Sequence, residues 1–250
     1  MAIWAIADLH LSFSVPNKKM DRFGAHWQDH PQKVESAWRQ LVKEEDLVLI
    51  AGDISWALHL SDAVADLEWI GQLPGTKVLI KGNHDYWWGS LAKIEKILPP
   101  SCHLIQNCAF HWKEVAIAGA RLWDAPELDF NDLIHFTGAK AKEVLTITDF
   151  SKESLKIYER ELHRLEVSLK QMQTDASIKI AMTHYPPIGA KGEPSAASQL
   201  LEKYQINHCV FGHLHNVKKE ANCFGVHRGV HYHLVAADYL ENFSPIKIVD

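Results

Sequence analysis

Five short apolar runs in this chain each end at a polar side chain that can bind a metal, and this feature limits the fold more than any other. The runs cover residues 2–7, 47–51, 78–80, 178–182 and 209–211, and the polar groups after them are Asp8 and His10, Asp53, Asn83, His184, and His213 with His215. Short continuous apolar runs are typical of strands buried on both faces. The carboxyl ends of parallel strands lie along one edge of a sheet, where ligands bind. One such residue alone is more often an ordinary loop residue. Five strand ends that each carry a potential metal ligand predict a single shared site.

Helical segments alternate with the first three apolar runs. Residues 31–45, 61–73 and 90–97 have helical spacing or flanking Pro and Gly residues. This alternation predicts a parallel α/β core with helices packed on it.

Beyond residue 100 the pattern changes. Residues 103–105, 109–112 and 115–118 lie at hairpin spacing, which predicts antiparallel strands, and residues 225–249 predict two or three closing strands. Segment 120–176 is the least strand-like part of the chain. Within it, Ser151 can cap a helix whose apolar residues recur at steps of three and four, and a helix laid across a sheet is favoured over a coiled coil.

No linker or repeat divides the sequence, so we expect a single domain over residues 1–250. Segment 120–176 is a candidate for a cap-like helical insertion that limits substrate size, a hypothesis that rests on its composition alone.

Composition and charge argue against several classes of protein. The formal net charge of −5 does not favour a surface that binds nucleic acid by bulk charge. No apolar run approaches the roughly 18 to 20 residues that span a bilayer, and residues 1–7 lack the features of a signal peptide. The four cysteines form no CxxC pair, which favours free thiols in a reducing cytoplasm.

The residues at the strand ends form a mixed set of four histidines, two aspartates and one asparagine. Imidazole and oxygen ligands together suit divalent Mn, Fe, Zn or Co and contain too much nitrogen for calcium. Seven ligands exceed what one tetrahedral site needs, but they suit two ions that share a bridging carboxylate.

The ordered blocks Asp8-Leu9-His10, Gly52-Asp53, Gly82-Asn83-His84-Asp85, Thr183-His184 and Gly212-His213-Leu214-His215 resemble the signature of the calcineurin-like metallophosphoesterase superfamily. The resemblance implies an α/β (α+β) fold, a four-layer αββα sandwich of two mixed β-sheets flanked by helices. It also implies two divalent metal ions. One would take Asp8, His10, Asp53 and His215, and the second Asp53, Asn83, His184 and His213.

The leading hypothesis is therefore a cytoplasmic phosphohydrolase for small-molecule phosphomonoesters or phosphodiesters, in which a hydroxide bridging the two metals attacks phosphorus. His84 would protonate the leaving group or stabilise the transition state. Asp85 would hold the His84 imidazole in the required tautomer, with a simple loop carboxylate as the alternative.

Other functions on the same scaffold are a nuclease, a protein phosphatase or a non-catalytic interaction module. A nuclease needs a basic groove, and no Lys/Arg stripe occurs in the sequence. A non-catalytic module predicts lost ligands or a missing His84, and all of these residues are present.

Aromatic residues near the blocks have two interpretations. Trp56, Trp87 and Trp88 could line the cleft and stack on a flat substrate group, or they could pack in the core, which is favoured. Arg121 could contact a phosphate, although a structural surface arginine is favoured.

Overall fold

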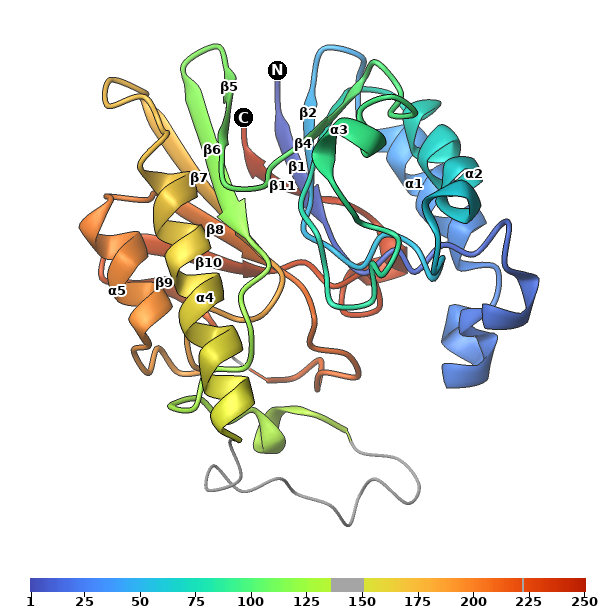
Figure 1. Cartoon of the computed structure of the whole chain (residues 1–250). Helices are drawn as coiled ribbons and strands as arrows, with labels where there is room; N and C mark the ends of the chain where they lie inside the picture. Colours follow the sequence, from blue (N-terminus) through green and yellow to red (C-terminus); the bar gives the residue numbers. More distant parts are fainter. Residues whose placement is uncertain (136–150, 222) are drawn as a thin grey trace.

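Residues 1–135, 151–221 and 223–250 are described by the computed structural model, in which two sheets pack face to face between layers of helices (Figure 1). The first sheet has the strand order β11-β1-β2-β3-β4. Its strands are β1 (Ile3–Ile6), β2 (Leu47–Ile50), β3 (Thr76–Leu79), β4 (Cys102–Leu104) and β11 (Ile246–Val249). β1 to β4 are parallel, and β11 runs antiparallel to β1. Because helices and a second sheet cover both faces, β1 and β2 are apolar at every position and fully buried.

The second sheet has the strand order β5-β6-β7-β8-β10-β9. Its strands are β5 (Ala109–Trp112), β6 (Val115–Ala120), β7 (Ile178–Thr183), β8 (His208–Phe211), β9 (Gly225–His227) and β10 (Val230–Leu234). β6, β7, β8 and β10 are parallel, and the edge strands β5 and β9 are antiparallel to their neighbours.

The helices form the outer layers. α1 (His30–Leu41), α2 (Leu60–Gly71) and the single turn α3 (Leu91–Ile94) lie on the side of the first sheet, and α4 (Lys152–Leu169) and α5 (Ala196–Lys203) cover the second (Figure 1). Short 3-10 turns lie in the connections at Pro16–Lys18, Met20–Phe23, Ala25–Trp27, Asn131–Leu133 and Glu241–Phe243. This arrangement is the four-layer αββα sandwich that the resemblance implied.

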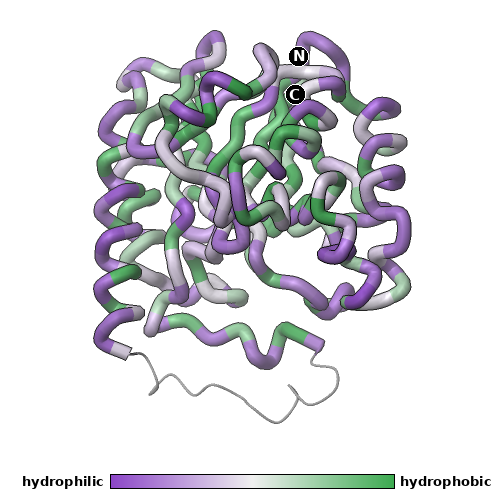
Figure 2. Tube along the Cα trace, turned by 45° about the vertical axis from the view of Figure 1, so that its right-hand side comes forward, coloured by the Kyte–Doolittle hydropathy of each residue, from purple (hydrophilic) through white to green (hydrophobic). Residues whose placement is uncertain are grey.

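Hydrophobic residues gather on the inner part of the chain trace, and hydrophilic residues alternate with hydrophobic ones along the outer helices (Figure 2). Ile117, Ile180 and Val210 of the second sheet belong to the same buried cluster as the strands of the first. Leu165 of α4 and Leu201 of α5 belong to a second cluster on the opposite face. Successive side chains of a strand point to opposite faces of the sheet, so the second sheet contributes residues to both hydrophobic clusters.

One predicted strand pairs differently in the structure, and the helix predicted after Ser151 is present. Residues 102–104 form β4, which is parallel to β3 in the first sheet rather than antiparallel as predicted. α4 begins after Ser151, whose side chain accepts a hydrogen bond from the Ser154 amide at 3.1 Å, and it packs on β6 as an outer layer. Residues 136–150 of the suggested cap-like insertion lie outside the described residues, so the cap stays a prediction. No helix in the described ranges is long and apolar enough to cross a membrane.

Candidate metal centre

All seven predicted ligands lie together at the carboxyl ends of the strands. Their side chains are held by the loops after β1 (Asp8 and His10), β2 (Asp53), β3 (Asn83), β7 (His184) and β8 (His213 and His215). Both sheets therefore contribute to one site, with Asp8, His10, Asp53 and His184 almost completely buried.

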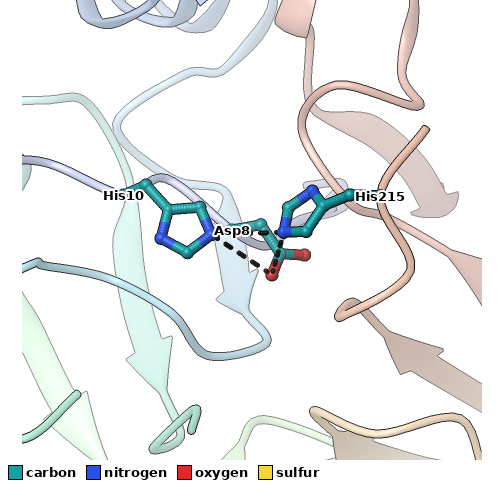
Figure 3. A group of neighbouring side chains, drawn as sticks. All are labelled: Asp8, His10 and His215. Carbon is teal, nitrogen blue, oxygen red and sulfur yellow. Dashed lines mark hydrogen bonds and ion pairs between the residues drawn. The ribbon is translucent and has the colours of Figure 1, made fainter. Parts of the chain in front are cut away.

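Asp8, His10 and His215 form the first group of potential ligands (Figure 3). The two imidazole Nε2 atoms lie 3.2 Å apart, and they lie 4.0 Å (His10) and 3.7 Å (His215) from Asp8 Oδ1. Asp8 Oδ1 is buried and has no hydrogen-bond partner among the described residues. A buried carboxylate oxygen without a donor is costly unless a cation is bound there, so this group fits a metal ion.

The second group contains His184, His213 and Asn83. His184 Nε2 lies 2.7 Å and His213 Nδ1 3.1 Å from Asn83 Oδ1. Asp53 lies between the two groups, because its Oδ2 is 3.4 Å from His184 Nε2 and 3.7 Å from His10 Nε2. The positions of these donors fit two divalent ions that share Asp53.

Four of the candidate ligands also have a strained backbone. Asp8, His10, Asp53 and His213 have φ values of 58°, 45°, 51° and 71°, in the left-handed region that non-glycine residues rarely adopt. Each such residue costs on the order of 1–3 kcal/mol, and strain of this kind is typical of functional sites.

Two of the glycines in the motifs are required by close approach of the loops. A Cβ at Gly82 would collide with the backbone and carboxylate of Asp53. A Cβ at Gly212 would lie 2.6 Å from Ala7 Cβ and would also collide with the Asp8 carboxylate. The glycine before each ligand therefore allows ligands from different strands to meet.

Two groups outside the ligand set orient the imidazoles. His215 Nδ1 lies 2.8 Å from Asp238 Oδ1, and His184 Nδ1 lies 3.0 Å from the Ala51 carbonyl oxygen. If the Nδ1 atoms carry the protons in these bonds, both Nε2 atoms are free to face the metal site. Burial alone would lower the pKa of both histidines, but nearby carboxylates raise it to about 9. Metal binding requires neutral imidazoles, so it would release protons here.

Asp238 was not identified from the sequence. It follows residues 234–237, which are apolar, so it stands at the end of a strand like the ligands themselves. Applying the same strand-end criterion to the last part of the chain would have found it.

Burial is the main influence on three other titratable groups of the site. Burial raises the pKa of Asp8 to about 7 and lowers the pKa of His10 and His213 well below the ordinary value for histidine. Charged forms are thus unfavourable in this cleft without a counter-charge, and a divalent cation would supply one to the aspartates.

The hydrogen bonds of Asp85 go to the backbone and to Trp87, and none joins it to His84 in the described part of the chain. Its Oδ1 accepts hydrogen bonds from the amides of Ile54 (2.9 Å) and Ser55 (3.1 Å) and from Trp87 Nε1 (3.0 Å), and its Oδ2 accepts from the Gly82 amide at 2.7 Å. This fully buried carboxylate therefore joins the loop after β2 to the loop after β3. These contacts favour the alternative interpretation, a loop carboxylate.

His84 lies beside the ligands as expected. Its amide donates to Asp53 Oδ1 at 2.8 Å, and its ring packs on Trp56 and His10 at centroid distances of 4.4 and 5.7 Å. Its buried Nδ1 has no hydrogen-bond partner within the described residues. Because Asp85 does not bond to it, the His84 ring is held by packing on the neighbouring aromatic rings.

The nearby aromatic residues separate into two groups. Trp87 and Trp88 are buried in the core, as the favoured interpretation predicted. Trp56 is only partly buried and stacks on His10 at 4.8 Å, so it forms part of the wall of the site. Arg121 pairs with the buried Glu161 at 3.2 Å, and its carbonyl oxygen accepts the amide of His184.

Comparison with known protein families matches residues 1–217 to the calcineurin-like phosphoesterases. The chain belongs to this family. Among curated proteins, this calcineurin-like chain is 36% identical over 83 residues to the Gene 66 protein of Mycobacterium phage D29 and 33% identical over 82 residues to that of Mycobacterium phage L5. These matches cover 33% of the chain and only 40% and 39% of the two phage proteins.

Two solved structures are similar in fold. Phosphopantetheinyl hydrolase (PptH) from Mycobacterium tuberculosis has a TM-score of 0.58 at 13% identity, with 99% of this chain and 95% of that chain covered. GAP50, the anchor in the inner membrane complex of Plasmodium, has a TM-score of 0.51 at 10% identity, with 99% and 75% covered. At these identities the likeness supports the fold alone.

Proposed function

We propose that this chain is a phosphohydrolase that cleaves phosphoester bonds of small molecules in the cytoplasm and depends on two divalent metal ions. The observation that carries the proposal is the position of Asp53 Oδ2, within 3.7 Å of imidazole nitrogens from both ligand groups. A carboxylate in this position suits a bridge between two ions.

The ligands divide as the family resemblance implies. Asp8, His10, Asp53 and His215 would hold one ion, and Asp53, Asn83, His184 and His213 the other. When bound, such a pair binds phosphate oxygens and supplies a water-derived nucleophile near neutral pH. Their positive charge would also attract an anionic ester to a chain whose formal net charge is −5.

His84 is the group that would act on the ester itself. Its ring is half-buried beside Asp53 and is free to bond a phosphoryl or leaving-group oxygen. Burial lowers its pKa, so the imidazole is neutral near pH 7 until an anionic substrate favours the protonated form. The protonated ring can then donate its proton to the departing alkoxide.

A nuclease or a protein phosphatase remains the second enzymatic candidate, and it fits less well because the chain is acidic overall. A non-catalytic module predicts lost ligands or a missing His84, and all of these are present at one site. The match of residues 1–217 to the calcineurin-like phosphoesterases supports the enzymatic class.

The decisive experiment is metal analysis followed by assay of the manganese-loaded protein on p-nitrophenyl phosphate and bis(p-nitrophenyl) phosphate. We expect metal-dependent release of nitrophenol from at least one of them, abolished by EDTA. His84→Ala should keep both metals and lower kcat by about 10²- to 10⁴-fold, the usual contribution of a general acid. His163→Ala, at an exposed position on α4, is the matched control. Two bound metals without turnover of either substrate would contradict the proposal and favour a binding module.

A further inference from the structure

A polar cavity of about 260 Å³ lies beside the metal centre, between the ends of β3, β4 and β6 and the outer helix α4. Four cationic side chains line it, namely Lys81, Arg121, Arg160 and Arg164. The chain connects it to the metal site, because Lys81 stands two residues before Asn83 and the Arg121 carbonyl oxygen accepts the His184 amide at 3.1 Å.

The charges around this cavity do not balance. Glu161 is the one acidic residue in its lining, so four positive charges against one negative charge leave a formal excess of +3. The excess is notable in a chain whose net charge is −5. Like charges held together in a cavity repel unless an anion is bound between them.

Glu161 holds the arginines close together without neutralising them. All three guanidinium groups meet its single Oε1 atom, at 3.2 Å for Arg121, 3.5 Å for Arg160 and 2.7 Å for Arg164. Glu161 is itself buried, with 1% of its surface exposed, whereas the side chains of Arg160 and Arg164 are 53% and 45% exposed. Most guanidinium N–H groups therefore remain available for another acceptor.

Arg121 is the most restrained of these cations. Its guanidinium lies 4.8 Å from the centre of the Trp123 ring, and its Nε is buried without a hydrogen-bond partner among the described residues. A buried N–H without an acceptor is unusual. Lys81, on the other side of the cavity, donates to the Trp88 carbonyl oxygen at 3.2 Å and can bond further acceptors through its remaining protons.

We infer that this cavity is an anion-binding subsite for a phosphoryl group, separate from the phosphate held at the metal centre. Guanidinium groups bind phosphate through paired hydrogen bonds of fixed geometry, and three of them around one cavity suit a tetrahedral oxyanion. The volume of about 260 Å³ is ample for a phosphoryl group.

Two sources could supply that phosphoryl group. It could be a second phosphate on the substrate itself, which rests on the proposed hydrolysis, or free inorganic phosphate bound independently of turnover. The chemistry of recognition is the same in both cases.

The test is calorimetric titration of inorganic phosphate into the manganese-loaded protein. We expect two phosphates per chain for the wild type, and EDTA should remove the one at the metal centre. The double variant Arg160→Gln/Arg164→Gln should lose the other or bind it at least about ten-fold more weakly, because two charge-assisted contacts are removed while Arg121 still pairs with Glu161. Lys152→Gln/Lys156→Gln removes the same charge from exposed positions on the same helix and should behave as the wild type.

A second variant tests the same cavity independently, in case the double arginine variant misfolds. A Cβ at Gly89, on the cavity wall, would meet no atom within 4 Å, so Gly89→Asp adds a carboxylate there without a clash. It should also weaken the second phosphate. Unchanged affinity in both cavity variants, or an equal loss in the lysine control, would overturn the inference.

A kinetic comparison distinguishes the two sources. If the substrate provides the phosphoryl group, the cavity variants should lower kcat/KM for a nucleoside 3′,5′-bisphosphate about ten-fold relative to a nucleoside 5′-monophosphate. If the ratio does not change while the second phosphate is lost, free phosphate is the ligand. Phosphate binding requires no turnover, so failure of the proposed hydrolysis would leave the calorimetric result decisive.

Discussion

Replacing Asp85 by asparagine separates two explanations of its place in the centre, one as a partner of His84 and one as a bridge between loops. In the structure Asp85 Oδ1 accepts three N–H groups, from Ile54, Ser55 and Trp87, and Oδ2 accepts the Gly82 amide. An asparagine can keep its oxygen on the first three donors, but its NH2 group must then face the Gly82 N–H. One buried donor is left unsatisfied, at a cost of about 1–3 kcal/mol. For a domain of this size, that corresponds to a fall in Tm of roughly 2–12 °C.

The assay is thermal unfolding of the manganese-loaded variant together with its metal content. We expect a lower Tm and weaker metal binding, because the loops that hold Asp53 and Asn83 are no longer joined. Asp175→Asn, at an exposed position, is the control and should unfold with the wild type. An Asp85→Asn protein with wild-type Tm and metal content, changed only in the pH profile of kcat, would refute the bridge and restore the role in orienting His84.

Three further changes have defined outcomes. Asp238→Asn removes the carboxylate that orients His215, so metal affinity measured by calorimetry should fall about 10- to 100-fold; equal affinity would show that this bond is dispensable. Gly82→Ala pushes a methyl group into Asp53 and should abolish binding of both metals by elemental analysis, whereas Gly89→Ala should not. Burial and two neighbouring histidines lower the pKa of His233 to about 4. An unfolded histidine takes up its proton near pH 6.5, so the fold loses stability as the pH falls from about 6.5 to 4. In His233→Gln the fall of Tm across this window should be smaller, and a parallel fall would contradict this.

Much of the centre could be predicted from the sequence because one physical rule applies to every strand. Parallel strands bring their carboxyl ends to one edge, so a ligand after each apolar run predicts a shared site without knowledge of the strand order. The structure has Asp8, Asp53 and His184 together at that edge, although they are far apart in the chain. The strand-end rule does not depend on which sheet each strand joins.

The parts that were missed depend on contacts between separate segments. The spacing of residues 103–105 suggested a hairpin, but spacing does not tell which sheet a strand enters, and the chain passes from the first sheet to the second between β4 and β5. The neighbours of Asp85 along the chain suggested His84 as its partner. Its hydrogen bonds from Ile54 and Ser55 depend on how two loops meet in space, which no local pattern records.

The strain at the ligands shows what the scaffold contributes to the centre. Asp8, His10, Asp53 and His213 hold left-handed conformations that none of them favours, at a combined cost of several kcal/mol. Each loop is tied to its neighbour: the Asp8 amide donates to the Gly52 carbonyl at 2.9 Å, the His10 amide to the Asp53 carbonyl at 2.9 Å, and the His213 amide to Asp8 Oδ2 at 3.0 Å. These bonds join ligand loops to one another without using the imidazole nitrogens. Because the sheets and these bonds hold the strained backbone, the protein itself positions the candidate ligands, and the affinity for a metal need not offset the cost of ordering the loops.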